Sequence, residues 1–156
     1  MANFSQFAVR DLGVLGVTLL LWWLDNRDLD VLTGLMSGLC ALLFHEWGHL
    51  YGAWRCQAKV RPAPNLLLPF LFDLGATNSS NQFVTTSLWG FYATGVFLLF
   101  FYLVLPVNHA ASTVTWWVSG VLASLTVVIE FPIAWRVYRG HAIPTVKIYN
   151  RGDKWN

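Results

Sequence analysis

Ionisable residues are scarce in this chain of 156 residues. Asp, Glu, Lys and Arg together make up 12% of it, whereas hydrophobic residues make up 56%. A large soluble domain is excluded, because it would need a more polar surface than these residues can provide. The composition is typical of an integral membrane protein, and the length predicts a single transmembrane domain over residues 1–156.

Cysteine is also rare, and a cleavable signal is missing. The two cysteines, Cys40 and Cys56, are too few and too far apart in helical phase to form a metal cluster, so we expect free thiols. Arg10 and Asp11 precede an apolar stretch that lacks a small-residue cleavage site. We therefore expect the N-terminal stretch to be retained as a helix.

What the chain has in abundance is apolar segments of membrane-spanning length. They predict an all-α integral membrane protein with about four transmembrane helices, over residues 7–24, 31–54, 87–106 and 113–135. Tryptophans support these limits, because aromatic rings favour the membrane interface and most tryptophans here lie near predicted helix ends.

The basic residues predict the orientation. If the N-terminus is cytoplasmic, every Lys and Arg except Arg27 falls on the cytoplasmic side, while Asp25, Asp28 and Asp30 lie outside. Both termini are thus predicted to be cytoplasmic, with a short basic tail over residues 136–156 and a weak strand signal at 145–149. We expect the basic residues to face anionic lipid and predict no nucleic-acid partner.

The connection between the second and third helices is unusual. Arg61-Pro62-Ala63-Pro64 cannot be helix interior, and the apolar run from Asn65 to Phe72 is too short to cross a bilayer. We predict a short membrane-associated hairpin or re-entrant loop there, followed by a solvated turn over residues 77–82.

The most informative motif is His45-Glu46-Trp47-Gly48-His49 in the second predicted span. On a helix, residues four apart lie on one face, so both imidazoles can bind one metal ion, with Glu46 beside it as a general base. This is the arrangement of a zinc hydrolase. His45 precedes Arg55 by ten residues, which places the site about 15 Å inside the membrane from the cytoplasmic end. Gly34, Gly38, Ala41, Gly48 and Gly52 lie along or beside this face, so we expect other helices to pack closely against it.

A catalytic zinc ion usually has three protein ligands, so a third ligand is expected. Glu130 is the leading candidate, because it lies in the fourth span on the same half of the membrane as the two histidines. Asp73 is the alternative, since a re-entrant loop could bring it to the metal. His109 is expected in the short outer turn and His141 in the solvated tail, so neither is favoured.

The segment from Phe44 to Val60, FHEWGHLYGAWRCQAKV, resembles the site-2 proteases, a family of intramembrane zinc metalloproteases. Leu67 to Phe70, LLPF, is similar to the hairpin that follows this helix in compact bacterial members, and Ala93-Thr94-Gly95 falls where the family has Ala-Gly-Pro. The family takes its third ligand from an Asn-Pro...Asp-Gly motif. This chain has Glu130-Phe131-Pro132 at the corresponding place.

The resemblance implies an enzyme of the prokaryotic inner membrane that cuts a membrane-embedded protein segment. In such an enzyme, Zn²⁺ activates water and Glu46 moves the proton. The run at Leu66, Leu67, Leu68 and Phe70 is the expected substrate-binding edge, where an unwound substrate adds as a strand. The alternative hypothesis is a catalytically inactive membrane subunit that keeps the metal-site scaffold and serves as a structural or assembly element of a larger membrane complex.

Overall fold

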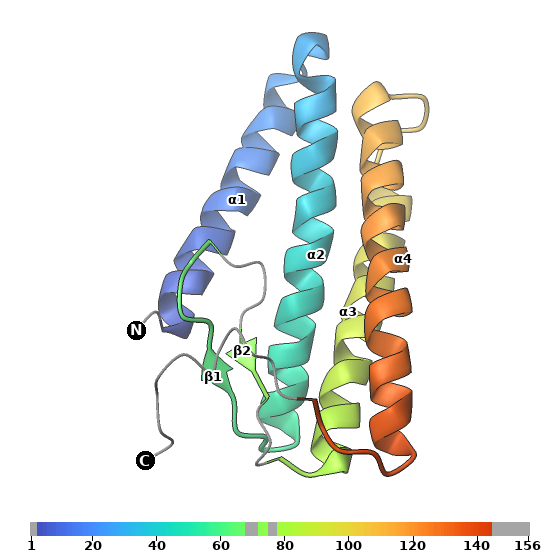
Figure 1. The fold of residues 1–156 in the computed structure, drawn as a ribbon. Coiled ribbons are helices and arrows are strands. Elements are labelled where there is room, and N and C mark those ends of the chain that lie inside the picture. The colour runs from blue at the N-terminus through green and yellow to red at the C-terminus, as the bar shows by residue number, and fades with distance from the viewer. Residues whose placement is uncertain (1–2, 68–71, 75–77, 145–156) are drawn as a thin grey trace.

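The computed structural model describes residues 3–67, 72–74 and 78–144, and four long helices dominate this part of the chain (Figure 1). In chain order the elements are α1 (Phe4–Leu24), the short 3-10 helix η1 (Arg27–Leu29), α2 (Asp30–Arg55), β1 (Arg61–Pro62), β2 (Phe72–Asp73), α3 (Ser80–Val104) and α4 (Ala110–Tyr138). The predicted helical fold is confirmed, with four helices that are long and apolar enough to cross a membrane. Apart from the start of α3, each predicted helix end lies within three residues of the observed one.

Helix α3 begins seven residues before the predicted start at residue 87, and the prediction of a turn over residues 80–82 was wrong. The reason is a capping box: the Ser79 side chain accepts from the backbone N–H of Gln82, and the Gln82 side chain accepts from the backbone N–H of Ser79. These bonds satisfy amide groups that a helix start leaves unpaired, so polar residues can begin the helix before its apolar part.

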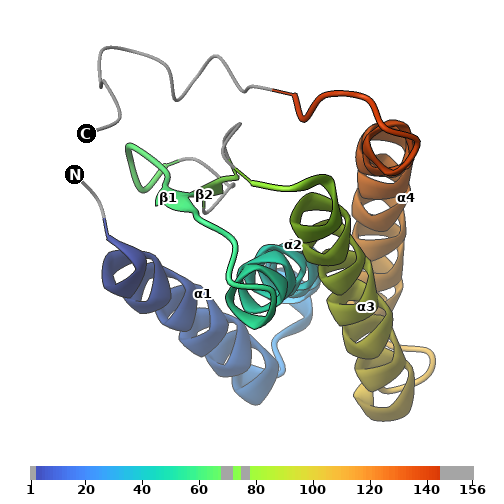
Figure 2. The same cartoon turned by 90° about the horizontal axis from the view of Figure 1, so that it is seen from below.

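Helix α2 is central. It packs against α1 on one side and against α3 and α4 on the other, and the view along the bundle shows α1 set apart from α3 and α4 (Figure 2). A small apolar cluster joins α2 to α3 through Cys40, Ala41, Phe97 and Phe101, and Val14 and Leu15 of α1 pack against it. α2 is therefore the element on which the other three helices are assembled.

The predicted close approach along the glycines of α2 is confirmed. A Cβ atom added to Gly34 or Gly38 would overlap Val114 or Val118 of α4, and one added to Gly48 or Gly52 would overlap Ala93 or Trp89 of α3. Two glycines thus admit α4 near one end of α2, while two others admit α3 near the opposite end.

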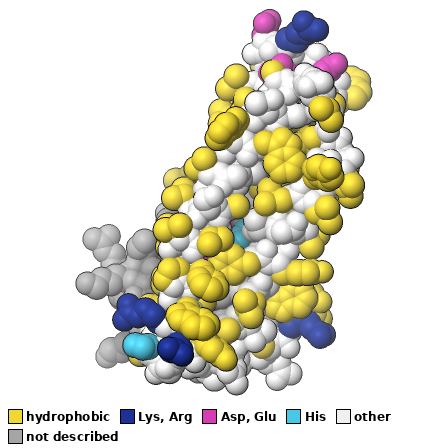
Figure 3. All heavy atoms as spheres, turned by 90° about the vertical axis from the view of Figure 1, so that its right-hand side faces the viewer, with side chains coloured by type: hydrophobic (Ala, Val, Ile, Leu, Met, Phe, Trp, Pro, Cys, Tyr) yellow, Lys and Arg dark blue, Asp and Glu magenta, His cyan; other side chains and the backbone are white. Residues whose placement is uncertain are grey.

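The outer surface of the four helices is apolar. All four are long and apolar enough to cross a membrane, and large hydrophobic side chains such as Trp23 and Trp117 are more than two thirds exposed. Figure 3 shows hydrophobic side chains along the whole length of one face, acidic side chains with a single basic one at one end, and further basic side chains toward the other end. A surface of this kind matches a hydrocarbon layer between two polar boundaries.

Strands β1 and β2 form an antiparallel pair in which Arg61 faces Asp73 and Pro62 faces Phe72. The segment between them includes Leu66 and Leu67, which follow β1 as turn residues, and Leu67 is 93% exposed. A guanidinium N–H of Arg10 in α1 donates to the carbonyl oxygen of Leu66 (2.7 Å), which ties this connection to the start of the bundle. Leu68, Phe70 and the predicted strand at 145–149 lie outside the described residues.

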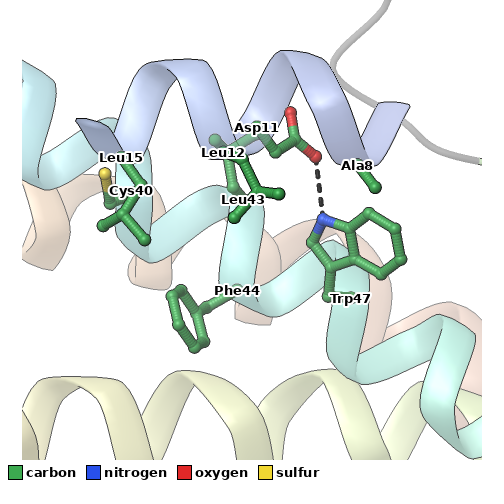
Figure 4. A pocket seen from close by; sticks show the side chains of 8 residues that line it. All are labelled: Ala8, Asp11, Leu12, Leu15, Cys40, Leu43, Phe44 and Trp47. Atoms are coloured by element: carbon green, nitrogen blue, oxygen red, sulfur yellow. Dashed lines mark hydrogen bonds between the residues drawn. The ribbon is translucent and has the colours of Figure 1, made fainter. Parts of the chain in front are cut away.

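A cavity of about 290 Å³ lies between α1 and α2 and is lined mainly by apolar side chains (Figure 4). At one end the indole N–H of Trp47 donates to Oδ2 of Asp11 (2.8 Å), and Arg10 pairs with the other carboxylate oxygen (2.6 Å). The buried carboxylate is therefore satisfied by donors from two helices, and this contact joins α1 to α2 across an otherwise apolar interface.

Candidate metal centre

Two histidines of α2 point into the bundle from successive turns. His45 is 1% exposed and His49 is 12% exposed, and their Nε2 atoms are 2.9 Å apart. This geometry follows from the spacing, since side chains at i and i+4 of a helix lie one above the other on the same face.

Helix α4 brings Glu130 to the same point. Both of its carboxylate oxygens lie 3.2 Å from Nε2 of His45, and Oε2 lies 3.0 Å from Nε2 of His49. Glu46, which is buried, completes a group of four in which one possible ligand atom from each residue lies within 4.8 Å of the others. The structure thus assembles the two histidines with both glutamates that the sequence contains.

Helix α3 holds the opposite edge of each imidazole. Nδ1 of His49 donates to the backbone carbonyl oxygen of Thr86 (2.9 Å), because a carbonyl can only accept. Nδ1 of His45 lies 2.8 Å from the hydroxyl oxygen of Thr94, whose own hydrogen is donated to the carbonyl oxygen of Gly90 (3.2 Å). With its hydrogen donated in this way, the Thr94 oxygen can accept from Nδ1 of His45.

When both imidazoles carry their proton on Nδ1, their lone pairs converge on Glu130. A neutral imidazole with its proton on Nδ1 has a lone pair on Nε2, so the two Nε2 atoms and the Glu130 carboxylate present three acceptors to one another. Acceptors at 2.9–3.2 Å repel unless a cation or an additional proton lies among them. Two imidazole nitrogens and a carboxylate oxygen are a suitable ligand set for a divalent metal ion, so these residues could hold one.

A glycine of α3 makes room for one of the rings. A Cβ atom added to Gly90 would lie 2.1 Å from Cε1 of His49. Any larger residue at position 90 would therefore displace the His49 imidazole or separate the two helices.

Beside His45, on the side of Thr94, is a cavity of about 10 Å³ lined by residues of α2, α3 and α4. Its lining includes Ser119, which is buried and whose hydroxyl has no hydrogen-bond partner among the described residues, and Thr126. The cavity has about the volume that one water molecule needs, and its lining combines apolar side chains with a few polar ones.

The other predicted candidates lie elsewhere. His109 caps α4 by accepting from the backbone N–H of Ala111, and its Nε2 donates to Asp25 at the end of α1 (3.2 Å). His141 follows α4, and its ring lies against the carbonyl oxygen of Arg136. The backbone of Asp73 is in β2, and its side chain lies outside the described part of the chain. Cys40 and Cys56 are free thiols, as expected.

The sequence did not predict the contacts that α3 makes with the two imidazoles. Thr86, Gly90 and Thr94 lie four residues apart and so share one stripe of the helix, with the same period as the two histidines. Small and hydroxyl residues at this spacing are common wherever apolar helices pack, so the pattern became informative only when the histidines were seen against it.

Comparison with known proteins adds no assignment. A scan against protein-family models, a search of curated proteins and a search of solved structures each gave no match.

Proposed function

We propose that this chain is an integral membrane zinc metalloprotease of the site-2 protease type, which cleaves a membrane-embedded segment of another protein. One observation carries the proposal: two imidazole Nε2 atoms and a carboxylate converge next to Glu46, while both Nδ1 atoms are already engaged by α3. Ionisable groups buried between apolar helices are costly in free energy, and binding of a metal ion would offset that cost.

In this proposal His45, His49 and Glu130 hold the ion. Zn²⁺ bound there supplies a Lewis acid that acidifies water and polarises a carbonyl group. Glu46 accepts the proton of the attacking water and delivers it to the leaving amine nitrogen, so that one peptide bond is exchanged for a carboxylate and an amine. Nδ1 donation to Thr86 and Thr94 keeps both imidazoles oriented during this exchange.

The proposed substrate is a transmembrane segment that unwinds locally, since a helix hides its carbonyl groups in its own hydrogen bonds. The connection between α2 and α3, at Leu66, Leu67, Leu68 and Phe70, is the proposed docking edge and the proposed re-entrant element. Its support is the antiparallel β1–β2 pair, to which an extended segment can add by backbone hydrogen bonding.

The proposed location is the prokaryotic inner membrane, with both termini in the cytoplasm. Its support is the separation of charge along the bundle, because basic residues favour the cytoplasmic side. The start of α1 and the end of α4 lie at the same end of the bundle as the β1–β2 connection (Figure 1), and anionic lipid is the proposed partner of the basic residues there.

A second candidate function is a metal-bearing subunit without catalytic activity, which would act in the assembly of a membrane complex. It is favoured by the position of Glu130, whose carboxylate contacts both imidazoles of α2 from α4, so that an ion held there would tie the two helices together. Under this hypothesis the metal ion joins α2 to α4 and has no catalytic role.

A pair of variants tests the proposal. Glu46→Gln keeps all three ligands, so it is expected to retain about one zinc per chain while cleavage is lost; His45→Ala is expected to lose both. Metal content is measured on purified protein. Cleavage is measured by comparing newly formed N-termini in membranes from cells that express the wild-type or the Glu46→Gln chain. Identical fragment patterns with full zinc content in both would favour the inactive subunit.

A further inference from the structure

The hydroxyl of Thr94 is the only hydrogen-bond partner of Nδ1 of His45 among the described residues. Its oxygen is placed to accept from that nitrogen, and its own hydrogen can then be donated to the carbonyl oxygen of Gly90, which can only accept. When the two hydrogen bonds run in this direction, the proton of His45 is on Nδ1 and its lone pair is on Nε2, which faces Glu130 and His49.

We propose that Thr94 is a positioning residue of the metal centre: its hydroxyl selects the Nδ1–H tautomer of His45 and thereby makes Nε2 available to a divalent cation. This inference rests on the proposed function only in so far as the cluster binds a metal ion. It does not depend on whether the bound ion catalyses hydrolysis.

The alternative tautomer explains why the hydroxyl matters. Without an acceptor at position 94, the buried Nδ1–H of His45 has no partner, which is costly in an apolar interior. The tautomer with the proton on Nε2 is then the more stable one, because Nε2–H can donate to either oxygen of Glu130 at 3.2 Å. The histidine and the glutamate would satisfy each other, and the cation would lose two ligands at once.

A second threonine provides a matched control, because Thr→Val makes the same change of side-chain shape at both positions. Thr86 lies on the same stripe of α3 and is fully buried, but it holds His49 through its backbone carbonyl. Its hydroxyl has a different neighbour, the sulfur of Cys56 at 3.7 Å. Thr86→Val therefore removes a buried hydroxyl and leaves the hydrogen bond to the histidine in place, whereas Thr94→Val removes that bond.

The experiment measures zinc affinity of the purified full-length chain in detergent, by competition with a chromophoric chelator. Thr94→Val is expected to weaken binding by about 10- to 100-fold, the range found when a partner of a metal-bound histidine is removed. Thr94→Ser, which keeps the hydroxyl, and Thr86→Val are expected to stay within about threefold of wild type. The absorption spectrum of bound Co²⁺ is expected to change only in Thr94→Val.

Circular dichroism verifies that each variant is folded, and if Thr94→Val does not fold, Thr94→Ala is compared with Thr94→Ser instead. Wild-type affinity in the folded Thr94→Val chain overturns the positioning role and leaves the proposed function intact. An equal loss of zinc affinity in Thr94→Val and Thr86→Val also overturns it, because a change in packing would then explain both losses. A wild-type chain that binds no zinc overturns both proposals. If only Thr94→Val loses zinc affinity and the wild-type chain shows no cleavage, the positioning role is supported and the protease proposal is contradicted.

Discussion

Glu130 and His49 are 81 residues apart in the chain, yet Oε2 of Glu130 lies 3.0 Å from Nε2 of His49. This contact joins α4 to the central helix α2. The carboxylate lies closer to this imidazole than to that of His45, although it is within hydrogen-bonding distance of both. Three measurable consequences concern the contacts that hold the histidines and the helices in place.

Replacing the carboxylate of Glu130 tests its role as third ligand. Glu130→Gln keeps the size of the side chain but replaces an anionic oxygen donor by a neutral amide. We expect zinc affinity to fall by more than about tenfold, the lower limit for loss of an outer partner. Competition titration of the purified chain measures this. Unchanged affinity would indicate that another carboxylate, such as Asp73, supplies the third ligand.

Gly90 is expected to tolerate no side chain. Gly90→Ala places a Cβ atom 2.1 Å from Cε1 of His49, so the ring must move or the helices must separate. Such overpacking costs about 1–3 kcal/mol. Thermal unfolding should show a lower melting temperature, and zinc titration should show weaker binding. Gly95→Ala is the control, because nothing lies within 4 Å of its Cβ position on the same helix; if both variants behave alike, the close contact with His49 has no energetic importance.

The Asp11–Trp47 hydrogen bond is expected to stabilise α1 against α2 without affecting the centre. Trp47→Phe removes the indole donor and leaves a buried carboxylate oxygen with one donor fewer, at a cost of about 1 kcal/mol. Its control, Trp23→Phe, changes a side chain that is 79% exposed. We expect a lower melting temperature only in Trp47→Phe and unchanged zinc affinity in both. A loss of zinc in Trp47→Phe would contradict the separation between the α1 contact and the metal site.

The orientation can be tested by labelling single cysteines in a chain whose own two cysteines are replaced by serine. A cysteine at Asp28, in the turn between α1 and α2, is expected to react with a membrane-impermeant maleimide added outside intact cells. A cysteine at Arg139, just after α4, is expected to react only after the cells are opened. The reverse pattern would show that the cytoplasmic and outer sides have been exchanged.

The sequence was sufficient for the number of helices and for the residues of α2 that form the centre. Both depend on local patterns: apolar length sets a span, and the i, i+4 spacing places His45 and His49 on one face. The convergence of Glu130 with them was also expected, because its depth in the fourth span matched theirs.

What the sequence did not reveal depends on contacts between helices. The start of α3 was hidden because Ser79 and Gln82 form a capping box within a polar stretch that otherwise resembles a turn. The contact of Thr94 with His45 was hidden because a hydroxyl on an apolar helix most often bonds within its own helix. Only the rotation of α3 about its axis, which side-chain packing sets, turns that hydroxyl toward His45.

The position of Glu130 in α4 has a consequence for biosynthesis. During translation α2 emerges with His45, Glu46 and His49 well before the ribosome reaches Glu130. A nascent chain that comprises only α1, α2 and α3 holds two imidazoles and Glu46 but has no α4 to complete the group. The group of four is therefore assembled only after α4 is synthesised, so a chain that stops before residue 130 cannot form it.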